Sequence, residues 1–181
     1  METLERIAMV ARWRPVHLGH APVLRGMCDV GRVVLIGIGS SNRFNARSPF
    51  TAAEAEAMIR VVLGTRRNVT VVEVPDLDDG PRWREMVLRI FGSLDAFVTD
   101  NPYVASLLEN DYRVVRPVSL VAPEDRCPID GTMVRRAMAR GDGWQDLVPP
   151  AVARFISEGG LDDRFRRDFG LQTLALETME V

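Results

Sequence analysis

The sequence contains no lysine, because all 23 of its basic residues are arginines. This absence excludes chemistry that needs a lysine nucleophile, a lysine Schiff base or the lysine of a P-loop. Any phosphate group that the protein binds must therefore be held by arginine, histidine or backbone N–H groups. Genome composition explains the absence better than function does. Only two histidines are present, so their placement is informative.

Cysteines are equally few, and the two of them, Cys28 and Cys127, lie far apart in no metal-type pair. They are typical of reduced thiols in the cytoplasm, so we expect neither a disulfide framework nor a zinc site. No apolar run approaches the roughly 20 residues of a membrane helix. The first residues lack the cleavage site of a secretory signal. The formal net charge of −2 argues against a general nucleic-acid coat. We expect a cytoplasmic protein that binds neither membranes nor nucleic acid.

The chain length of 181 residues and the apolar content of 46% predict one domain with a sizeable core. Short runs rich in Val and Ile alternate with helical patterns. The expected strands are 7–11, 32–38, 69–74, 95–99 and 112–117. The expected helices are 20–28, 51–63, 81–91, 102–110, 132–140 and 150–157. This alternation predicts an α/β fold, a single doubly wound parallel sheet of Rossmann-like type with C-terminal helices.

Ligands of such sheets bind at the carboxyl ends of the strands, and the loop after the first predicted strand holds both histidines. They form the pattern His17-x-Gly19-His20 at the start of a helix. Residues three apart share a helix face, so the two imidazoles should point the same way, beside the positive end of the helix dipole. Gly19 leaves room for the close approach of a phosphate, and Arg12 and Arg14 add positive charge. The pattern predicts an anion site rather than a pair of surface histidines.

Metal binding is the competing use of two histidines. Such a site would need a carboxylate or thiolate nearby, and Asp29 and Cys28 are at best a few turns away. We therefore expect no metal ligand from protein side chains.

Two further loops are expected at the same edge of the sheet. The second strand ends at Gly39-Ser40, where a ligand can lie against backbone, although an ordinary tight turn explains the glycine equally well. Arg47 precedes the next helix and either reaches a phosphate or is simply solvated. Later in the chain, Asp130 or Thr132 can cap a helix whose free N–H groups bind an anion. Such a helix is unremarkable alone, but these loops together suit in-line displacement on a triphosphate.

These motifs resemble the nucleotidyltransferase superfamily with the HxGH signature, most closely the archaeal-type nicotinamide-nucleotide adenylyltransferases. The resemblance runs from Ala11 to about Glu158. The matching stretches, in chain order, are Arg12-Trp13-Arg14-Pro15-Val16-His17-Leu18-Gly19-His20, Ile38-Gly39-Ser40, Arg47-Ser48-Pro49-Phe50-Thr51-Ala52-Ala53-Glu54, Trp83, Asn101-Pro102, Asp130-Gly131-Thr132-Met133-Val134-Arg135 and Gly141-Asp142-Gly143-Trp144.

The resemblance implies transfer of AMP from ATP, with Mg²⁺, to nicotinamide mononucleotide, giving NAD and pyrophosphate. His17 and His20 would hold the phosphates and offset charge in the transition state. The catalytic set would be completed by the arginines Arg12, Arg47 and Arg135. Further ATP-binding residues would be Trp13, Arg14, Gly19, Gly39, Ser40, Thr132 and Met133. Trp83 would stack on the nicotinamide ring and Asn101 would line the acceptor pocket.

We therefore expect a nucleotidyltransferase domain over 1–160, followed by a helical C-terminal tail over 161–181 that packs on it. The partners would be ATP, bound with Mg²⁺, a small phosphorylated acceptor and further copies of the chain in a homo-oligomer.

The sequence departs from the family pattern in places. Asp130 replaces the family serine near the triphosphate, where it would repel phosphate, cap a helix or hold magnesium. Arg82 and Arg84 replace apolar residues around Trp83. Two alternatives therefore stay open: an adenylyl- or cytidylyltransferase acting on another small phosphate ester, and an impaired, regulatory nucleotide-binding module.

Overall fold

The computed structural model describes residues 3–178 of the chain. They form two compact units, each made of three segments. The first unit contains the described residues up to 11, together with 22–42 and 65–126. The second contains 12–21, 43–64 and the described residues from 127 onward. Within residues 3–178, no helix is long and apolar enough to cross a membrane.

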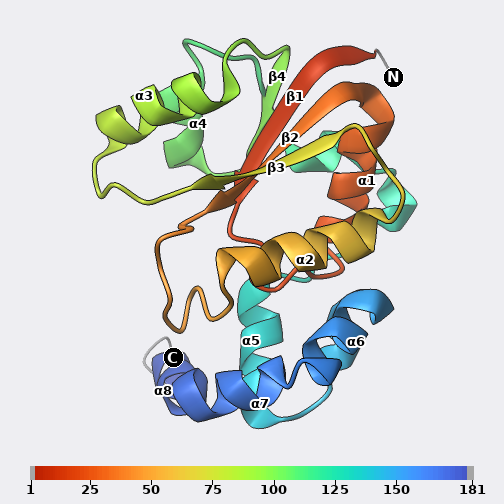
Figure 1. Cartoon of the computed structure of the whole chain (residues 1–181), viewed down its shortest axis with the longest axis vertical. Helices are drawn as coiled ribbons and strands as arrows, with labels where there is room; N and C mark the ends of the chain where they lie inside the picture. Colours follow the sequence, from red (N-terminus) through yellow and green to blue (C-terminus); the bar gives the residue numbers. More distant parts are fainter. Residues whose placement is uncertain (1–2, 179–181) are drawn as a thin grey trace. The chain divides into compact units, whose positions relative to one another are not determined.

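The first unit is built on a five-stranded sheet, in which β1 pairs with β2 on one side and β4 on the other (Figure 1). All strand pairs are parallel, and the strand order is β3-β2-β1-β4-β5. The strands are β1 (Leu4–Ala11), β2 (Gly31–Gly39), β3 (Val69–Val74), β4 (Ala96–Val98) and β5 (Val114–Val115). The predicted α/β class with a parallel sheet is confirmed.

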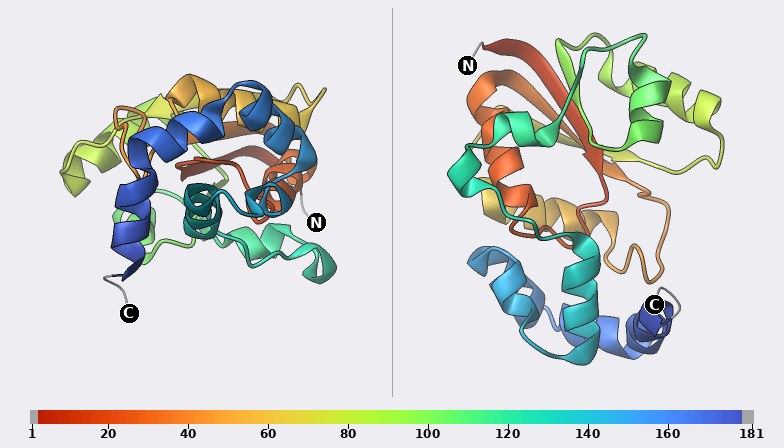
Figure 2. Two further views of the ribbon diagram at one scale, coloured as in Figure 1. Left: turned by 90° about the horizontal axis from the view of Figure 1, so that it is seen from below. Right: turned by 180° about the vertical axis from the view of Figure 1, so that it is seen from behind.

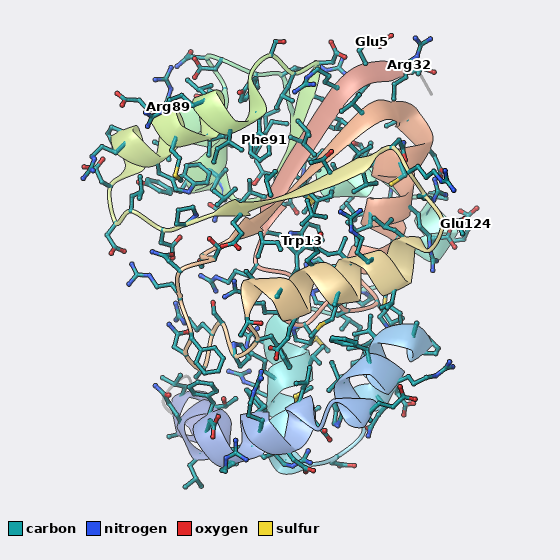
Figure 3. The ribbon with its side chains drawn as sticks, in the orientation of Figure 1. Glu5, Trp13, Arg32, Arg89, Phe91 and Glu124 are labelled. Carbon is teal, nitrogen blue, oxygen red and sulfur yellow. The ribbon has the colours of Figure 1, made fainter. Side chains whose placement is uncertain are left out.

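Helices α3 (Gly80–Phe91) and α4 (Pro102–Leu108) lie side by side beside the sheet (Figure 1). Their apolar side chains join those of the strands in one buried cluster, which includes Phe91, labelled in Figure 3, and Phe97. The helix α1 (His20–Val30) begins at the predicted residue and buries Met27. These apolar contacts explain why the strands read as nearly continuous apolar runs.

The predicted strand over 112–117 is wrong at both ends. Only Val114–Val115 pair with β4. Tyr112 instead turns its ring into the apolar cluster, and its hydroxyl donates to the Gly92 carbonyl oxygen. Pro117, which has no N–H for a sheet ladder, begins a 3₁₀ helix over Pro117–Leu120. The predicted helix over 102–110 likewise ends earlier, at Leu108.

The second unit is helical. Its helices are α2 (Ala52–Leu63), α5 (Gly131–Arg140), α6 (Pro150–Glu158), α7 (Leu161–Phe165) and α8 (Leu171–Thr178), with a π-helical turn over Arg166–Gly170. The predicted capping box of α2 is confirmed: the Thr51 hydroxyl accepts from the Glu54 N–H and the Glu54 carboxylate accepts from the Thr51 N–H. Helix α8 lies against α5 (Figure 2). The functional division of the chain at residue 160 stays a prediction.

Candidate active site

Three aromatic rings lie together where the loop after β1 enters α1, two of them in the loop and that of His20 at the start of the helix. The His17 and His20 rings stack with their centroids 3.6 Å apart, and the Trp13 ring lies 4.6 Å from that of His20. The His17 carbonyl oxygen accepts from the N–H groups of His20 and Ala21, which closes the turn into the helix. The imidazoles therefore lie together as expected, although His17 precedes the helix instead of starting it.

Both imidazoles are uncharged near neutral pH. Burial lowers the pKa of His17 to about 4; the Asp130 carboxylate opposes this shift and the Arg135 guanidinium adds to it. Burial, together with the neighbouring His17, holds the pKa of His20 well below its ordinary value. Within the described chain, the Nδ1 atoms of both rings are buried and make no hydrogen bond. The positive charge of this region therefore comes from arginines.

Four arginines from three distant segments line one pocket of the second unit. They are Arg12, Arg47, Arg135 and Arg136, and the pocket is completed by Ala46, Thr132, Thr173 and Leu176. Burial lowers the pKa of Arg135 to about 10, and the other three guanidinium groups lower it further against the opposing effect of Asp130. Collecting like charges costs free energy unless an anion offsets it. The pocket is therefore suited to an anion with several charges.

Two hydrogen bonds hold the Arg135 guanidinium in this pocket. It donates to the Thr132 hydroxyl at 3.2 Å and to the Arg14 carbonyl oxygen at 3.4 Å. Neither acceptor carries a charge. Among residues 3–178, no carboxylate forms an ion pair with Arg135, Arg12 or Arg47, so their charge remains available to a ligand.

Asp130 is the N-cap of α5. Its Oδ1 accepts from the Met133 N–H at 2.8 Å, and its backbone is extended. Of the two caps that the sequence allowed, the structure selects Asp130 and leaves Thr132 exposed at the pocket. A carboxylate at this position is favourable to the helix dipole. Asp130 thus has a structural role at the position where the family pattern has serine.

Gly19 is required by the protein's own backbone. A Cβ at this position would collide with the Ile129 carbonyl oxygen and would also crowd the Cys127 carbonyl oxygen, at 3.1 Å. The loop ahead of α5 therefore packs directly on the histidine turn. The sequence suggested space for a phosphate, whereas the structure shows space taken by backbone.

Trp13 and Arg14 are almost completely buried, unlike side chains that are free to contact a ligand. Trp13, labelled in Figure 3, has no exposed surface and adopts a left-handed φ of 56°. Arg14 is 2% exposed and donates from Nη1 to the Arg43 carbonyl oxygen at 2.9 Å. Both residues therefore shape the loop that carries the histidines. Their direct contact with ATP stays a prediction.

The remaining predicted site residues belong to the first unit. Gly39 ends β2, and Ser40 follows it, buried, with a φ of 53°. Trp83 lies in α3 and packs against the apolar cluster. Asn101 caps α4, its Oδ1 accepting from the N–H groups of the next helical residues. Trp83 and Asn101 thus have packing and capping roles, and their acceptor-binding roles stay predictions.

The chain is similar to curated archaeal enzymes over most of its length. It is 34% identical over 157 residues to a nicotinamide-nucleotide adenylyltransferase of Picrophilus torridus, covering 84% of this chain and 90% of that protein. The chain belongs to the nicotinamide-nucleotide adenylyltransferase family. An enzyme of the same name from Aeropyrum pernix is 29% identical over 171 residues, covering 91% of this chain and 97% of that protein. No protein-family model matches the sequence.

Solved structures show that this family member has a known fold. A bifunctional NMN adenylyltransferase/ADP ribose pyrophosphatase from Francisella tularensis matches with a TM-score of 0.77 at 16% identity. The match covers 98% of this chain but 56% of that protein, so the chain spans about half of its length. A second structure of that bifunctional enzyme, complexed with AMP and a manganese ion, has a TM-score of 0.65 at 17% identity.

Sequence reasoning missed the pocket residues contributed by α8, Thr173 and Leu176, and gave no role to Arg136. Arg136 adjoins a motif arginine, which was a usable signal. No sequence signal marked the contribution of α8. This helix packs against α5, which is distant in the sequence, and such a contact leaves no local pattern.

Proposed function

We propose that this family member transfers AMP from ATP to nicotinamide mononucleotide, giving NAD and pyrophosphate. The observation that carries the proposal is the pocket in which Arg135 lies with three other arginines, where burial and then those guanidinium groups lower the pKa of Arg135. A triphosphate supplies the charge that such a pocket needs. The names of the archaeal relatives, one of them 34% identical, support the same reaction.

In the proposed reaction, a 5′-phosphate oxygen of the mononucleotide attacks the α-phosphorus of ATP. The bond from that phosphorus to the oxygen bridging the α- and β-phosphates breaks, and pyrophosphate leaves with the electron pair. Negative charge grows on the leaving group, so fixed cations stabilise the transition state more than the ground state. We assign this role to Arg12, Arg47 and Arg135, which share the pocket.

His17 and His20 would act as neutral hydrogen-bond donors to phosphate oxygens. Their depressed pKa values keep both rings uncharged at neutral pH before the substrate binds. An arriving anion favours the protonated ring and raises these pKa values. The transfer itself needs no proton from either ring. The backbone at the start of α5 would offer a further donor at the Thr132 N–H, whereas the Met133 N–H is already donated to the Asp130 carboxylate.

Trp83 and Asn101 would contact the acceptor, and Gly39 and Ser40 would contact the adenine nucleotide. Asn101 uses its Oδ1 as a helix cap, so its amide N–H groups would face the acceptor.

Magnesium would enter as part of the substrate, bound to the ATP phosphates. No group of three or more His, Cys, Asp or Glu residues able to hold a metal occurs in the described part of the chain. The donor set therefore suits an ion carried by the nucleotide. The Francisella enzyme complexed with AMP and a manganese ion supports the general involvement of a divalent cation.

The test is a pyrophosphate-release assay with ATP or CTP against a panel of phosphorylated acceptors, with NAD measured directly. We expect release only with ATP and nicotinamide mononucleotide. Release with another pair would favour the alternative transferases. ATP binding without release from any acceptor would favour the regulatory module, although Asp130, the departure that suggests such a module, is accounted for as the cap of α5. A cytoplasmic location and a homo-oligomer stay predictions, to be tested by cell fractionation and light scattering.

A further inference from the structure

Arg47 is held in an unusual segment, whose two ends are contacted by one side chain of the C-terminal region. That side chain is Arg164, in α7. Its Nη1 and Nη2 donate to the two Glu54 carboxylate oxygens at 2.6 and 2.7 Å. Nη2 also donates to the Pro49 carbonyl oxygen at 3.3 Å. The Arg164 guanidinium therefore fixes the chain just after Arg47.

The same guanidinium reaches the chain before Arg47. Its Cζ lies 5.6 Å from the centre of the Phe44 ring. Phe169 meets that ring edge-on, with the centroids 5.2 Å apart. Between Phe44 and Pro49 the loop closes on itself, because the Asn45 Oδ1 accepts from the N–H groups of Arg47 and Ser48. Arg47 thus sits at the tip of a loop with both flanks held by Arg164.

The ion pair of Arg164 with Glu54 has the geometry and the burial of a stabilising contact. The two side chains are 25% and 19% exposed, and the paired N–H donors match the two carboxylate oxygens. The Glu54 carboxylate also accepts from the Thr51 N–H at 2.8 Å, which ties the same ion pair to the start of α2. Losing one partner of such a pair leaves a partly buried charge unpaired.

We propose that Arg164 is a positioning residue that holds the 44–50 loop so that Arg47 faces the anion pocket. The proposal rests on the proposed function, since it assigns Arg47 to phosphate binding. It gives the C-terminal helices a task in the reaction. Arg164 touches no substrate itself, and its effect passes through Arg47.

The experiment measures the KM for ATP, kcat and the binding of inorganic pyrophosphate for Arg164→Met, with Arg167→Met as the matched control. Arg167 lies on the same stretch of helix, and its side chain pairs with the adjacent Asp168. We expect Arg164→Met to raise the KM for ATP and the Kd for pyrophosphate about tenfold, since small misplacements of a binding group are costly. The KM for nicotinamide mononucleotide should change less than about twofold, and Arg167→Met should resemble the wild type.

The deciding measurement is the same substitution in an Arg47→Ala background. If Arg164 acts through Arg47, the Kd for pyrophosphate should rise by less than about twofold there, because the group being positioned is gone. A tenfold loss in both backgrounds, or equal effects of Arg164→Met and Arg167→Met, would overturn the proposal. If Arg164→Met does not fold, Arg164→Lys takes its place, since one ammonium cannot reproduce the paired contacts.

Pyrophosphate binding distinguishes a failure of the positioning role from a failure of the proposed function. Wild-type binding that is weakened by Arg164→Met supports the positioning role even if no acceptor reacts. Wild-type protein that binds no pyrophosphate would contradict both proposals.

Discussion

The His17 and His20 rings stack 3.6 Å apart, with their planes 25° from parallel. Two neutral rings can stack at this distance, whereas two imidazolium rings would repel each other. The depressed pKa values of both residues agree with this arrangement. Near neutral pH the pair therefore stays uncharged unless a bound anion offsets the added charge.

His17→Ala should lower kcat about 10²-fold, by analogy with the removal of one oxyanion donor. The ring lies next to the arginine pocket, where Arg135 influences its pKa. Steady-state kinetics and thermal unfolding of the same preparation check this. His20→Ala should lower both activity and stability, because the His20 ring packs between His17 and Trp13. Near-normal turnover of His17→Ala would contradict the proposed role of His17 as a donor to the phosphates.

Stability should fall as the pH drops below 6.5, and His17 should carry a measurable part of the loss. Its pKa is about 4 in the folded chain, against an ordinary value of 6.5, so the unfolded chain binds more protons between these values. The contribution of His17 to the free energy of unfolding is fully present above pH 6.5 and is lost as the pH falls towards 4. Between pH 7 and pH 5 this amounts to about 2 kcal/mol.

Urea unfolding of the wild type and of His17→Gln at pH 7 and pH 5 measures the contribution of His17 together with its coupling to His20, because the titration of more distant groups cancels in the difference. The wild type should lose about 2 kcal/mol more than the variant. Equal losses would show that His17 is not buried in its neutral form.

Asp130→Ser should leave the KM for ATP within about threefold of the wild type, because the two residues are comparable helix caps. Asp130→Ala should destabilise the protein by about 1 kcal/mol, because the Met133 N–H loses its acceptor. Kinetics and denaturant unfolding of both variants test this. A tenfold tighter KM in Asp130→Ser would show that the carboxylate opposes phosphate.

Trp83→Ala should weaken acceptor binding by about tenfold and leave the KM for ATP nearly unchanged, if the indole stacks on the nicotinamide ring. The packing of Trp83 against the apolar cluster means that the melting temperature should fall as well. Trp83→Phe is the control, since it keeps an aromatic face. Equal losses of both affinities in Trp83→Ala would make Trp83 only a packing residue.

The sequence predicted local features well. β3 spans the expected Val69–Val74, and the Thr51 and Glu54 capping box begins α2 as expected. These features depend on neighbouring residues. The fifth strand was predicted in the right place but with the wrong bounds, because Tyr112 packs into a core formed by distant residues. The arginine pocket was foreseen in part, from Arg12, Arg47 and Arg135, but the pairing of Arg164 with Glu54 leaves no trace in either local segment.

The hydrogen bond from Arg135 to the Arg14 carbonyl oxygen joins residues 121 positions apart. Contacts of such sequence separation form slowly, because a long loop must close before they are made. During synthesis, Arg12 and Arg47 emerge long before Arg135 and before Arg164, which holds the loop of Arg47. A growing chain therefore contains two of the four pocket arginines without the segment that completes the pocket. The ability to bind a triphosphate should appear abruptly, late in translation.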